Sequence, residues 1–313
     1  MNYLKNKKIL ILGASGQIGL ELIDHLDNYD CKITAVRYSK WQETSNEKIN
    51  YIRLDLYKIN KYKLKQLIEG HDYIFHLAGD TSVMADPEKE IDYLEKWVSP
   101  LHNILNLITN TNKVLVFASS VSVYGANPKF PVNEFTIDDP LTSYDVAKTC
   151  CDNLIRYYRN YHDVKCTSLR FSNIYGPETS AGNDSRRVIN KILNLMHKNK
   201  EISIVSDGEY KRNYIHVYDA ASMLIHGANN ISKTSSVLIA CSRENYSFKE
   251  IIMCLAKNYE NVFNKEIKIK VGLEKKFITD TRSFSGEPSK IFQEGFKFKY
   301  NLDQGFNELV KLI

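Results

Sequence analysis

A tyrosine and a lysine four residues apart, Tyr144 and Lys148, form the pair best placed in this sequence for moving a proton. The same YxxxK spacing also occurs at Tyr3/Lys7, Tyr57/Lys61 and Tyr161/Lys165. The pair at Tyr144 is the one preceded by an apolar strand, Val114–Ala118, that ends in serines, among them Ser120. It also opens a helical pattern, and residues i and i+4 of a helix lie on one face. We therefore predict that both side chains reach one site together with Ser120.

The chemistry that this trio would perform is a coupled transfer of hydride and proton. When hydride leaves or reaches a carbinol carbon, a proton must leave or reach the oxygen. A free phenol, whose pKa is about 10, is a weak base at neutral pH, whereas a neighbouring ammonium and an oxidised nicotinamide favour the phenolate. A serine hydroxyl can hold the reacting oxygen in place. Ser120, Tyr144 and Lys148 are thus the predicted catalytic residues of an oxidoreductase.

A strand, a glycine turn and a helix start follow one another near the N-terminus. The glycines have GxxGxxG spacing, which differs from the GxGxxG dinucleotide fingerprint. Glycine permits a sharp turn, and a helix N-terminus offers unpaired N–H groups to a pyrophosphate. Packing alone can explain such glycines, but their place after the first strand of an alternating chain favours a nicotinamide dinucleotide. The predicted cofactor contacts here are Gly13, Ser15, Gly16, Gln17, Ile18 and Gly19.

The residue after the second strand bears on the choice of cofactor. Dinucleotide folds usually place Asp or Glu there to accept the ribose 2′-OH. Here the strand Lys32–Val36 is followed by Arg37, whose guanidinium cannot accept that proton but can pair with a 2′-phosphate. Arg37 therefore favours NADP(H). The alternative is that Arg37 is a solvated residue stacking on adenine and that NAD(H) is used.

Short apolar runs alternate with amphipathic stretches through the first half of the chain. The runs are Lys8–Leu12, Lys32–Val36, Tyr51–Leu54, Tyr73–Ala78, Lys113–Ala118 and Lys165–Arg170, and the helical stretches include Gly19–Leu26, Ile91–Thr109 and Tyr144–Tyr161. Continuous apolar strands separated by helices are typical of a parallel sheet covered on both faces. We predict an α/β fold, a doubly wound Rossmann-type parallel sheet with a smaller C-terminal substrate domain.

After Arg170 the pattern changes to loops rich in Gly, Asn, Ser and charge. Further helices are predicted at Arg187–His197, His216–Ala228 and Phe248–Asn258, and the strand Ser236–Ala240 is predicted to return to the sheet. We expect an interleaved chain. Residues 1–170 with about 215–256 would form the dinucleotide-binding domain, and about 171–214 with 257–313 the substrate-binding part.

Composition excludes several classes of protein. Hydrophobic residues make up 43% and charged residues 25%, which is ordinary for a globular protein. No run approaches the ~20 apolar residues of a membrane span, and the polar N-terminus leads straight into a strand, so we expect a cytoplasmic protein with no membrane contact. The net charge of +5 is spread along the chain, which disfavours nucleic acid. The six cysteines lack CxxC spacing and are interpreted as buried thiols, so no metal site is predicted.

Further motifs occur along nearly the whole chain. They are Asp55-Leu56, His76-Leu77-Ala78-Gly79, Ser119-Ser120-Val121-Ser122-Val123-Tyr124-Gly125, Leu169-Arg170-Phe171-Ser172-Asn173-Ile174-Tyr175-Gly176-Pro177, the segment from Asp207 to Asp219, and Pro288-Ser289-Lys290 with Gly295-Phe296. With the glycine turn and YxxxK, this set resembles the extended short-chain dehydrogenase/reductase family, especially its nucleotide-sugar NAD(P)-dependent epimerase/dehydratase branch.

The resemblance implies roles for several residues. It implies that Ser120, Tyr144 and Lys148 are catalytic and that Asp55, Leu56, Leu77, Ala78 and Gly79 join the cofactor site. The substrate contacts that it implies are Thr81, Ser122, Asn173, Arg212 and, more weakly, Arg282. Alternatively, Asn173 ties down a turn and Arg212 is a surface or sheet-edge cation.

The family also implies a partner copy of the chain. A homodimer through a four-helix interface is expected, because the two helices concerned carry Leu94, Val98, Leu101, Leu105, Leu154, Tyr157 and Tyr158, more apolar surface than one sheet face needs.

Departures from the family pattern narrow the expected reaction. Val121 and Ser122 stand where sugar 4,6-dehydratases carry an Asp-Glu pair, so that elimination lacks its acid and base. Trp97 stands where many members have a structural Asn. We expect hydride transfer at C4 of a nucleotide-activated sugar, of the kind that feeds surface polysaccharides, by an epimerase, dehydrogenase or 4-ketoreductase. The alternatives are an oxidoreductase for a non-nucleotide alcohol or ketone and, more remotely, a non-catalytic dinucleotide-sensing protein.

Overall fold

A computed structural model describes the chain over residues 3–38, 46–79, 90–125, 129–177, 187–273 and 282–313. The described residues form a seven-stranded sheet in the order β11-β6-β5-β4-β1-β2-β3. Its strands are β1 (Lys8–Leu12), β2 (Lys32–Arg37), β3 (Ile49–Arg53), β4 (Tyr73–His76), β5 (Val114–Ser120), β6 (Lys165–Phe171) and β11 (Val237–Ala240). All neighbouring pairs run parallel, which confirms the predicted Rossmann-type sheet.

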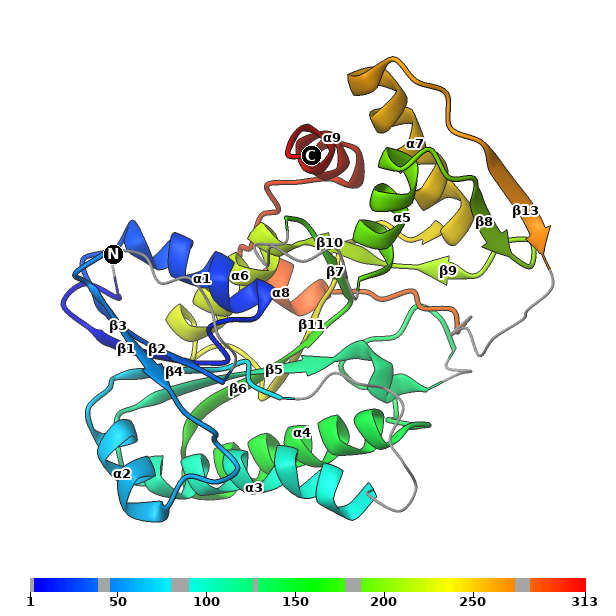
Figure 1. The fold of residues 1–313 in the computed structure, drawn as a ribbon. Helices are drawn as coiled ribbons and strands as arrows, with labels where there is room; N and C mark the ends of the chain where they lie inside the picture. The colour runs from blue at the N-terminus through cyan, green and yellow to red at the C-terminus, as the bar shows by residue number, and fades with distance from the viewer. Residues whose placement is uncertain (1–2, 39–45, 80–89, 126–128, 178–186, 274–281) are drawn as a thin grey trace.

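Helices cover both faces of this sheet, as the continuous apolar strands require (Figure 1). One face carries α1 (Gln17–Asp27) and α6 (Val217–Asn229), and the other carries α2 (Lys61–Glu69), α3 (Glu90–Ile108) and α4 (Ser143–His162). Strand β1 shows the alternation directly. Ile9 and Ile11 enter the core under α1, whereas Leu10 and Leu12 enter the core under α3 and α4.

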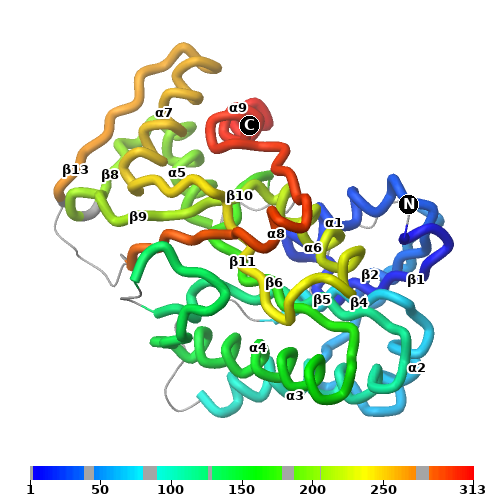
Figure 2. The backbone as a smooth tube through the Cα atoms, turned by 180° about the vertical axis from the view of Figure 1, so that it is seen from behind, coloured from blue at the N-terminus to red at the C-terminus, as the bar shows by residue number. Residues whose placement is uncertain are grey.

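The rest of the chain forms a smaller part beside the carboxyl ends of the strands (Figure 2). Its strands are paired in two-stranded sheets: β7 (Asn173–Tyr175) with β10 (Tyr214–His216), β9 (Lys211–Arg212) with β12 (Tyr246–Ser247), and β8 (Ile202–Val205) with β13 (Ile269–Leu273). Its helices are α5 (Val188–His197), α7 (Phe248–Phe263) and α9 (Leu302–Lys311), and a short helix α8 (Ser289–Gln293) precedes α9 in the chain. A third apolar cluster joins α5, α7 and α9.

Packing places two elements differently from the predicted division of the chain. Helix α7 contributes Ile251, Leu255 and Tyr259 to the cluster with α9, although residues up to 256 were assigned to the dinucleotide-binding domain. Helix α8 places Ile291 in the core with α1 and α6, although it was assigned to the substrate-binding part. Helix α7 therefore packs with α9, and α8 packs with α1 and α6.

The helices expected to form a dimer interface bury much of their apolar surface within the chain itself. Leu101 and Leu105 are fully buried, and Leu94, Val98 and Leu154 pack against the same core. Tyr157 stays 50% exposed and Tyr161 78% exposed on the outer face of α4. Less apolar surface of these two helices is therefore left for a partner than the sequence indicated.

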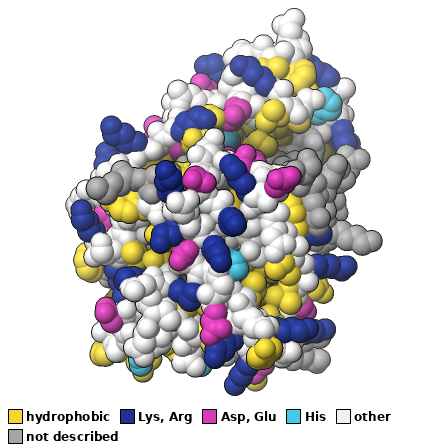
Figure 3. Space-filling view, turned by 90° about the vertical axis from the view of Figure 1, so that its left-hand side faces the viewer, with side chains coloured by type: hydrophobic (Ala, Val, Ile, Leu, Met, Phe, Trp, Pro, Cys, Tyr) yellow, Lys and Arg dark blue, Asp and Glu magenta, His cyan; other side chains and the backbone are white. Residues whose placement is uncertain are grey.

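Helix composition and surface charge of the described residues bear on contact with a membrane or with nucleic acid. None of their helices is long and apolar enough to cross a membrane. On the face shown in Figure 3, the coloured Lys and Arg side chains are interspersed with Asp and Glu. That face therefore presents mixed charge without a single-sign stripe.

Candidate active site

The three predicted catalytic residues come together at the carboxyl end of β5. Ser120 is the last residue of this strand, and Tyr144 and Lys148 lie in the first turns of α4. A capping box fixes the start of α4: Thr142 Oγ1 accepts from Asp145 N at 3.2 Å, and Asp145 Oδ2 accepts from Thr142 N at 3.1 Å. A well-defined first turn holds Tyr144 in place.

The surroundings of Tyr144 disfavour its phenolate form. Burial raises the pKa of Tyr144 above its usual range, and a hydrogen bond with the Ser120 side chain opposes that rise. Ser120 Oγ also accepts a hydrogen bond from Ser122 N at 3.2 Å, which fixes its position. The hydroxyl groups of Ser120 and Tyr144 therefore lie next to each other, where both can contact one substrate oxygen.

Lys148 is buried beneath Tyr144 and is only 3% exposed. Burial lowers its pKa to about 7. Its Nζ donates to Ala118 O at 2.6 Å and lies 3.7 Å from the ring centroid of Trp97 and 4.7 Å from that of Phe117. These π faces stabilise the ammonium form in a place from which water is excluded.

Trp97 lies in this site, although in the sequence it stands out only as a departure from the family pattern. Its ring also meets the ring of Tyr144 edge-on, with centroids 5.9 Å apart. A Cβ at Gly79 would overlap the indole, so glycine is required there. Trp97 thus packs directly on Gly79 and on Lys148. The signal that could have found this is the absence of the usual Asn.

The glycine turn has the close packing that a dinucleotide site needs. Gly13 has φ +89°, and a Cβ there would lie 2.6 Å from Ala78 N. A Cβ at Gly19 would lie 2.6 Å from Gly13 O, so a side chain at either position would push the turn apart. Helix α1 begins at Gln17 with Gly16 as N-cap and no side-chain cap. Its first N–H groups can therefore receive a phosphate.

The remaining cofactor candidates lie at the same edge of the sheet. Arg37 ends β2, and its carbonyl accepts from Leu54 N at 2.8 Å, next to Asp55 and Leu56. Asp55 Oδ1 accepts from Tyr57 N at 3.0 Å, so this carboxylate also shapes its own turn. Leu77 begins the segment after β4, where the Gly13 turn packs.

The segments that carry Asn173 and Arg212 lie side by side. Asn173 begins β7 and pairs with Tyr214 of β10, and its Nδ2 donates to Asn213 O at 3.2 Å. The guanidinium of Arg212 lies 4.9 Å from the ring centroid of Tyr210. Asn173 therefore helps to hold the turn beside Arg212.

Asn213, which the sequence did not single out, anchors this region. It is fully buried. Its Nδ2 donates to Ser242 O at 2.9 Å and Glu244 O at 2.8 Å, and its Oδ1 accepts from Ser242 N at 3.0 Å. No sequence signal separates this asparagine from the many others in the chain.

Other predicted substrate contacts have different surroundings from those expected. Arg282 Nη1 lies 3.0 Å from Asp145 Oδ2, so it pairs with the buried carboxylate that caps the catalytic helix. The Ser122 hydroxyl is buried and has no hydrogen-bond partner among the described residues. Thr81 lies outside the described residues.

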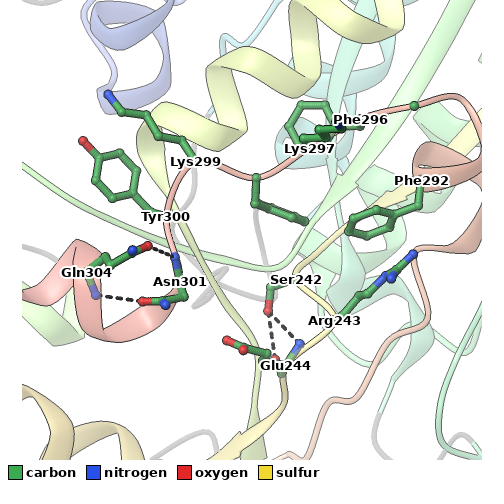
Figure 4. Close-up of a pocket in the computed structure, with 12 residues that line it drawn as sticks. Ser242, Arg243, Glu244, Phe292, Phe296, Lys297, Lys299, Tyr300, Asn301 and Gln304 are labelled. Atoms are coloured by element: carbon green, nitrogen blue, oxygen red, sulfur yellow. Dashed lines mark hydrogen bonds between the residues drawn. The ribbon is translucent and has the colours of Figure 1, made fainter.

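A cavity of about 580 Å³ lies elsewhere, between the loop after β11 and the segment that joins α8 to α9. Figure 4 shows Phe292 and Arg243 on one side, Tyr300 and Asn301 on the other, and Ser242 with Glu244 between them. None of the predicted catalytic or cofactor residues lines it. This cavity is therefore distinct from the site around Tyr144.

Comparison with known proteins shows to which family and fold this chain is similar. Residues 9–240 match the model of the NAD dependent epimerase/dehydratase family. A UDP-N-acetyl-alpha-D-glucosaminuronate decarboxylase of Bacillus cytotoxicus is 28% identical over 70% of this chain and 70% of its own. The structure of a UDP-N-acetylglucosamine 4-epimerase from Methanobrevibacter ruminantium M1 in complex with UDP-N-acetylmuramic acid has a TM-score of 0.83 at 22% identity, covering 98% of both chains. That of a UDP-glucuronic acid 4-epimerase from Bacillus cereus in complex with NAD has a TM-score of 0.79 at 19% identity, covering 97% of both.

These structural likenesses show the shared fold, and the family match covers most of the chain. The chain belongs to the NAD dependent epimerase/dehydratase family.

Proposed function

We propose that the protein transfers hydride between NAD(P) and C4 of a nucleotide-activated sugar, as an epimerase, a C4 dehydrogenase or a 4-ketoreductase. The observation that carries this proposal is the hydrogen-bonded pair of Ser120 and Tyr144 with Lys148 one helical turn further on. The nucleotide-sugar names of the relatives in the same family support the substrate class.

The residues around the glycine turn fit a dinucleotide. The turn admits no side chain at Gly13 or Gly19, and the uncapped N-terminus of α1 can bind the pyrophosphate. When bound, the nicotinamide ring takes up or releases hydride. Lys148, whose Nζ lies 5.6 Å from the Tyr144 ring centroid, places its charge beside the phenol.

The proton steps follow from the environment of Tyr144. As a buried neutral phenol, Tyr144 holds the proton that a substrate carbonyl oxygen takes up on reduction. In the reverse direction the phenolate form, favoured by the ammonium of Lys148, removes the proton from the hydroxyl. Ser120 donates to the same oxygen and fixes its distance from Tyr144.

The residues that follow Ser120 argue against a 4,6-dehydratase. Val121 lies in an apolar cluster with Tyr124 and Val132, and Ser122 offers a hydroxyl in place of a carboxyl group. Neither side chain can protonate a leaving hydroxyl or remove a proton from C5 near neutral pH. The proposed reaction therefore stops at oxidation and reduction of C4.

A substrate panel tests the proposal. The protein would be incubated with NAD⁺ or NADP⁺ and with UDP-, GDP-, dTDP- and CDP-sugars, and the products followed by NMR. We expect a C4 epimer or a 4-keto sugar from at least one of them. Turnover of a steroid, flavonoid or amino-acid alcohol with no reaction of any nucleotide sugar would favour the alternative class of substrate.

The state of the purified protein separates a reaction that recycles its own cofactor from one that uses the cofactor as a co-substrate. Absorbance in the reduced-nicotinamide band, with mass identification of any released cofactor, shows whether the dinucleotide is retained. A retained cofactor supports an epimerase, because such an enzyme returns its hydride to the same sugar, or a dehydrogenase that recycles its own cofactor. An empty protein supports a reductase that uses the cofactor as a co-substrate.

We also propose a homodimer through α3 and α4, in the cytoplasm. The exposed Tyr157 and Tyr161, whose rings lie 5.6 Å apart, offer aromatic surface on the outer face of α4. Light scattering at micromolar concentration should then give twice the mass of one chain. A monomer under these conditions would contradict the proposal.

A further inference from the structure

Gln17 connects the cofactor turn to a segment far away in the sequence. It is the first residue of α1, and it is only 8% exposed. Its Nε2 donates to Gly176 O and to Pro177 O, both at 3.1 Å. Both amide hydrogens of Gln17 are thus used on the backbone that follows β7.

A second buried amide reaches the same carbonyl from the other side. Asn190 of α5 donates from Nδ2 to Gly176 O at 3.1 Å. Gly176 therefore receives one hydrogen bond from the cofactor half and one from the substrate half of the molecule. Hydrogen bonds between buried amides and carbonyls hold two segments together because breaking one leaves a polar group unpaired.

The backbone at Gly176 has little freedom to move on its own. Gly176 has φ +142°, and a Cβ there would lie 2.6 Å from Val217 Cγ1 and 3.3 Å from His216 Nε2. Three residues earlier in the chain lies Asn173, the candidate for substrate binding. A displacement of Gly176 would therefore be passed to β7 and to α5.

The main chain and the side chain of Gln17 contact different parts of the molecule. Its main-chain N–H lies in the uncapped N-terminus of α1, where the pyrophosphate is expected. Its side chain lies on Gly176 and Pro177. The side-chain oxygens of Gln17 and Asn190 are buried and accept no hydrogen bond from the described residues, so each can still accept one from a ligand or water.

We propose that Gln17 is a positioning residue through which cofactor binding orders the substrate-binding segment Asn173–Pro177 and the start of α5. A phosphate held at the N-terminus of α1 restrains Gln17, and Gln17 restrains Gly176. Because coupling between two sites is reciprocal, a ligand on the substrate side tightens cofactor binding by the same link. The inference rests on the proposed function in taking Asn173–Pro177 as substrate-facing.

Hydrogen exchange measured by mass spectrometry tests the link without any nucleotide sugar. The full chain and Gln17→Met would each be compared with and without NAD⁺, at a concentration that saturates that protein. NAD⁺ should slow exchange at the start of α1 in both. In α5 it should slow exchange at least threefold in the unaltered protein and leave Gln17→Met unchanged.

Two further variants accompany this measurement, one as a second test of the link and one as a control. Asn190→Ala removes the second hydrogen bond to Gly176 from outside the cofactor turn, and it should weaken the NAD⁺ effect on α5 in the same way. Gln66→Met alters an exposed glutamine of α2 that donates to Tyr62 Oη, and it should behave as the unaltered protein.

Equal NAD⁺-dependent protection of α5 in the unaltered protein and Gln17→Met would overturn the proposal, and so would its absence from the unaltered protein. A failure of every nucleotide sugar to react would count against the proposed function alone, because neither arm of this experiment contains one.

Discussion

The catalytic half and the substrate half of this molecule hold their candidate residues in different ways. Ser120, Tyr144 and Lys148 lie on a strand of the seven-stranded sheet and on a long, capped helix. Asn173 and Arg212 lie on strands of three and two residues, in separate two-stranded sheets. A rigid scaffold suits a reaction whose atoms must meet at fixed distances, whereas short loops and strands can be altered for different ligands. The reaction type can therefore be predicted from the catalytic half, whereas the substrate is harder to predict from the substrate half.

The largest effect should follow from removing the Tyr144 hydroxyl. In Tyr144→Phe the proton donor is lost, so we expect turnover to fall by roughly 10²- to 10⁴-fold. NAD(P) binding should stay within about tenfold, because the ring and its contact with Trp97 remain. Steady-state kinetics and cofactor titration measure both. Retention of most of the activity would refute the catalytic assignment.

A change in the substrate half should instead affect binding. A guanidinium at position 212 can pair with a diphosphate, so UDP or GDP should raise the melting temperature by binding the native state. Arg212→Ala should abolish that shift and raise KM by roughly 10- to 100-fold with a smaller change in kcat. Arg243→Ala, which alters an exposed arginine that stacks on Phe292, is a matched control.

The nucleotide-sugar assignment has a simple contrary result. If UDP, GDP, dTDP and CDP all leave the melting temperature unchanged at millimolar concentration, a non-nucleotide alcohol or ketone becomes the better substrate class.

Cofactor choice should depend on one side chain at the end of β2. If Arg37 pairs with a 2′-phosphate, NADP(H) binds more tightly than NAD(H), and Arg37→Asp reverses the order by roughly tenfold in each affinity. Isothermal titration of both cofactors against both proteins gives the four constants. Tighter binding of NAD(H) by the unaltered protein would show that Arg37 plays another role.

A further effect concerns the dependence of stability on pH in the catalytic half. Burial lowers the pKa of Lys148 to about 7 in the folded protein, whereas its pKa in the unfolded chain is about 10.5. Between these two pH values the unfolded chain therefore binds one proton at Lys148 that the folded protein does not. Lys148 therefore destabilises the fold most below pH 7, and this cost shrinks as pH rises, by at most about 1.4 kcal/mol per pH unit. The unfolding free energy of the unaltered protein should rise relative to Lys148→Met from pH 7 to 9. Parallel curves would mean that Lys148 titrates normally.

The sequence predicted what regular periodicity and spacing determine. The helix expected at Ile91–Thr109 is α3, Glu90–Ile108, and the strand expected at Ser236–Ala240 is β11, Val237–Ala240. Apolar runs reveal such elements because burial repeats along the chain. The meeting of Ser120 with Tyr144 was also predictable, since both lie at the carboxyl edge of a parallel sheet.

Contacts made by single side chains across the fold could not be predicted in this way. The helix expected to end at Asn258 continues to Phe263. Asn258 is buried within it and donates to Asp303 Oδ1 at 3.0 Å. The pairing of Arg282 with Asp145 likewise joins residues that lie 137 positions apart in the chain. Such partners depend on tertiary packing, which overrides local preference.

The pairing of β11 with β6 has a consequence for synthesis of the chain. Val237–Ala240 forms the outermost strand beside Ser168–Phe171, and all four of its residues are buried. Until the ribosome has released this strand, β6 has an unpaired, apolar edge that can join the edge of another nascent chain. A product truncated before residue 237 should therefore aggregate, and the two parts of the molecule cannot be produced separately by cutting the gene after residue 170.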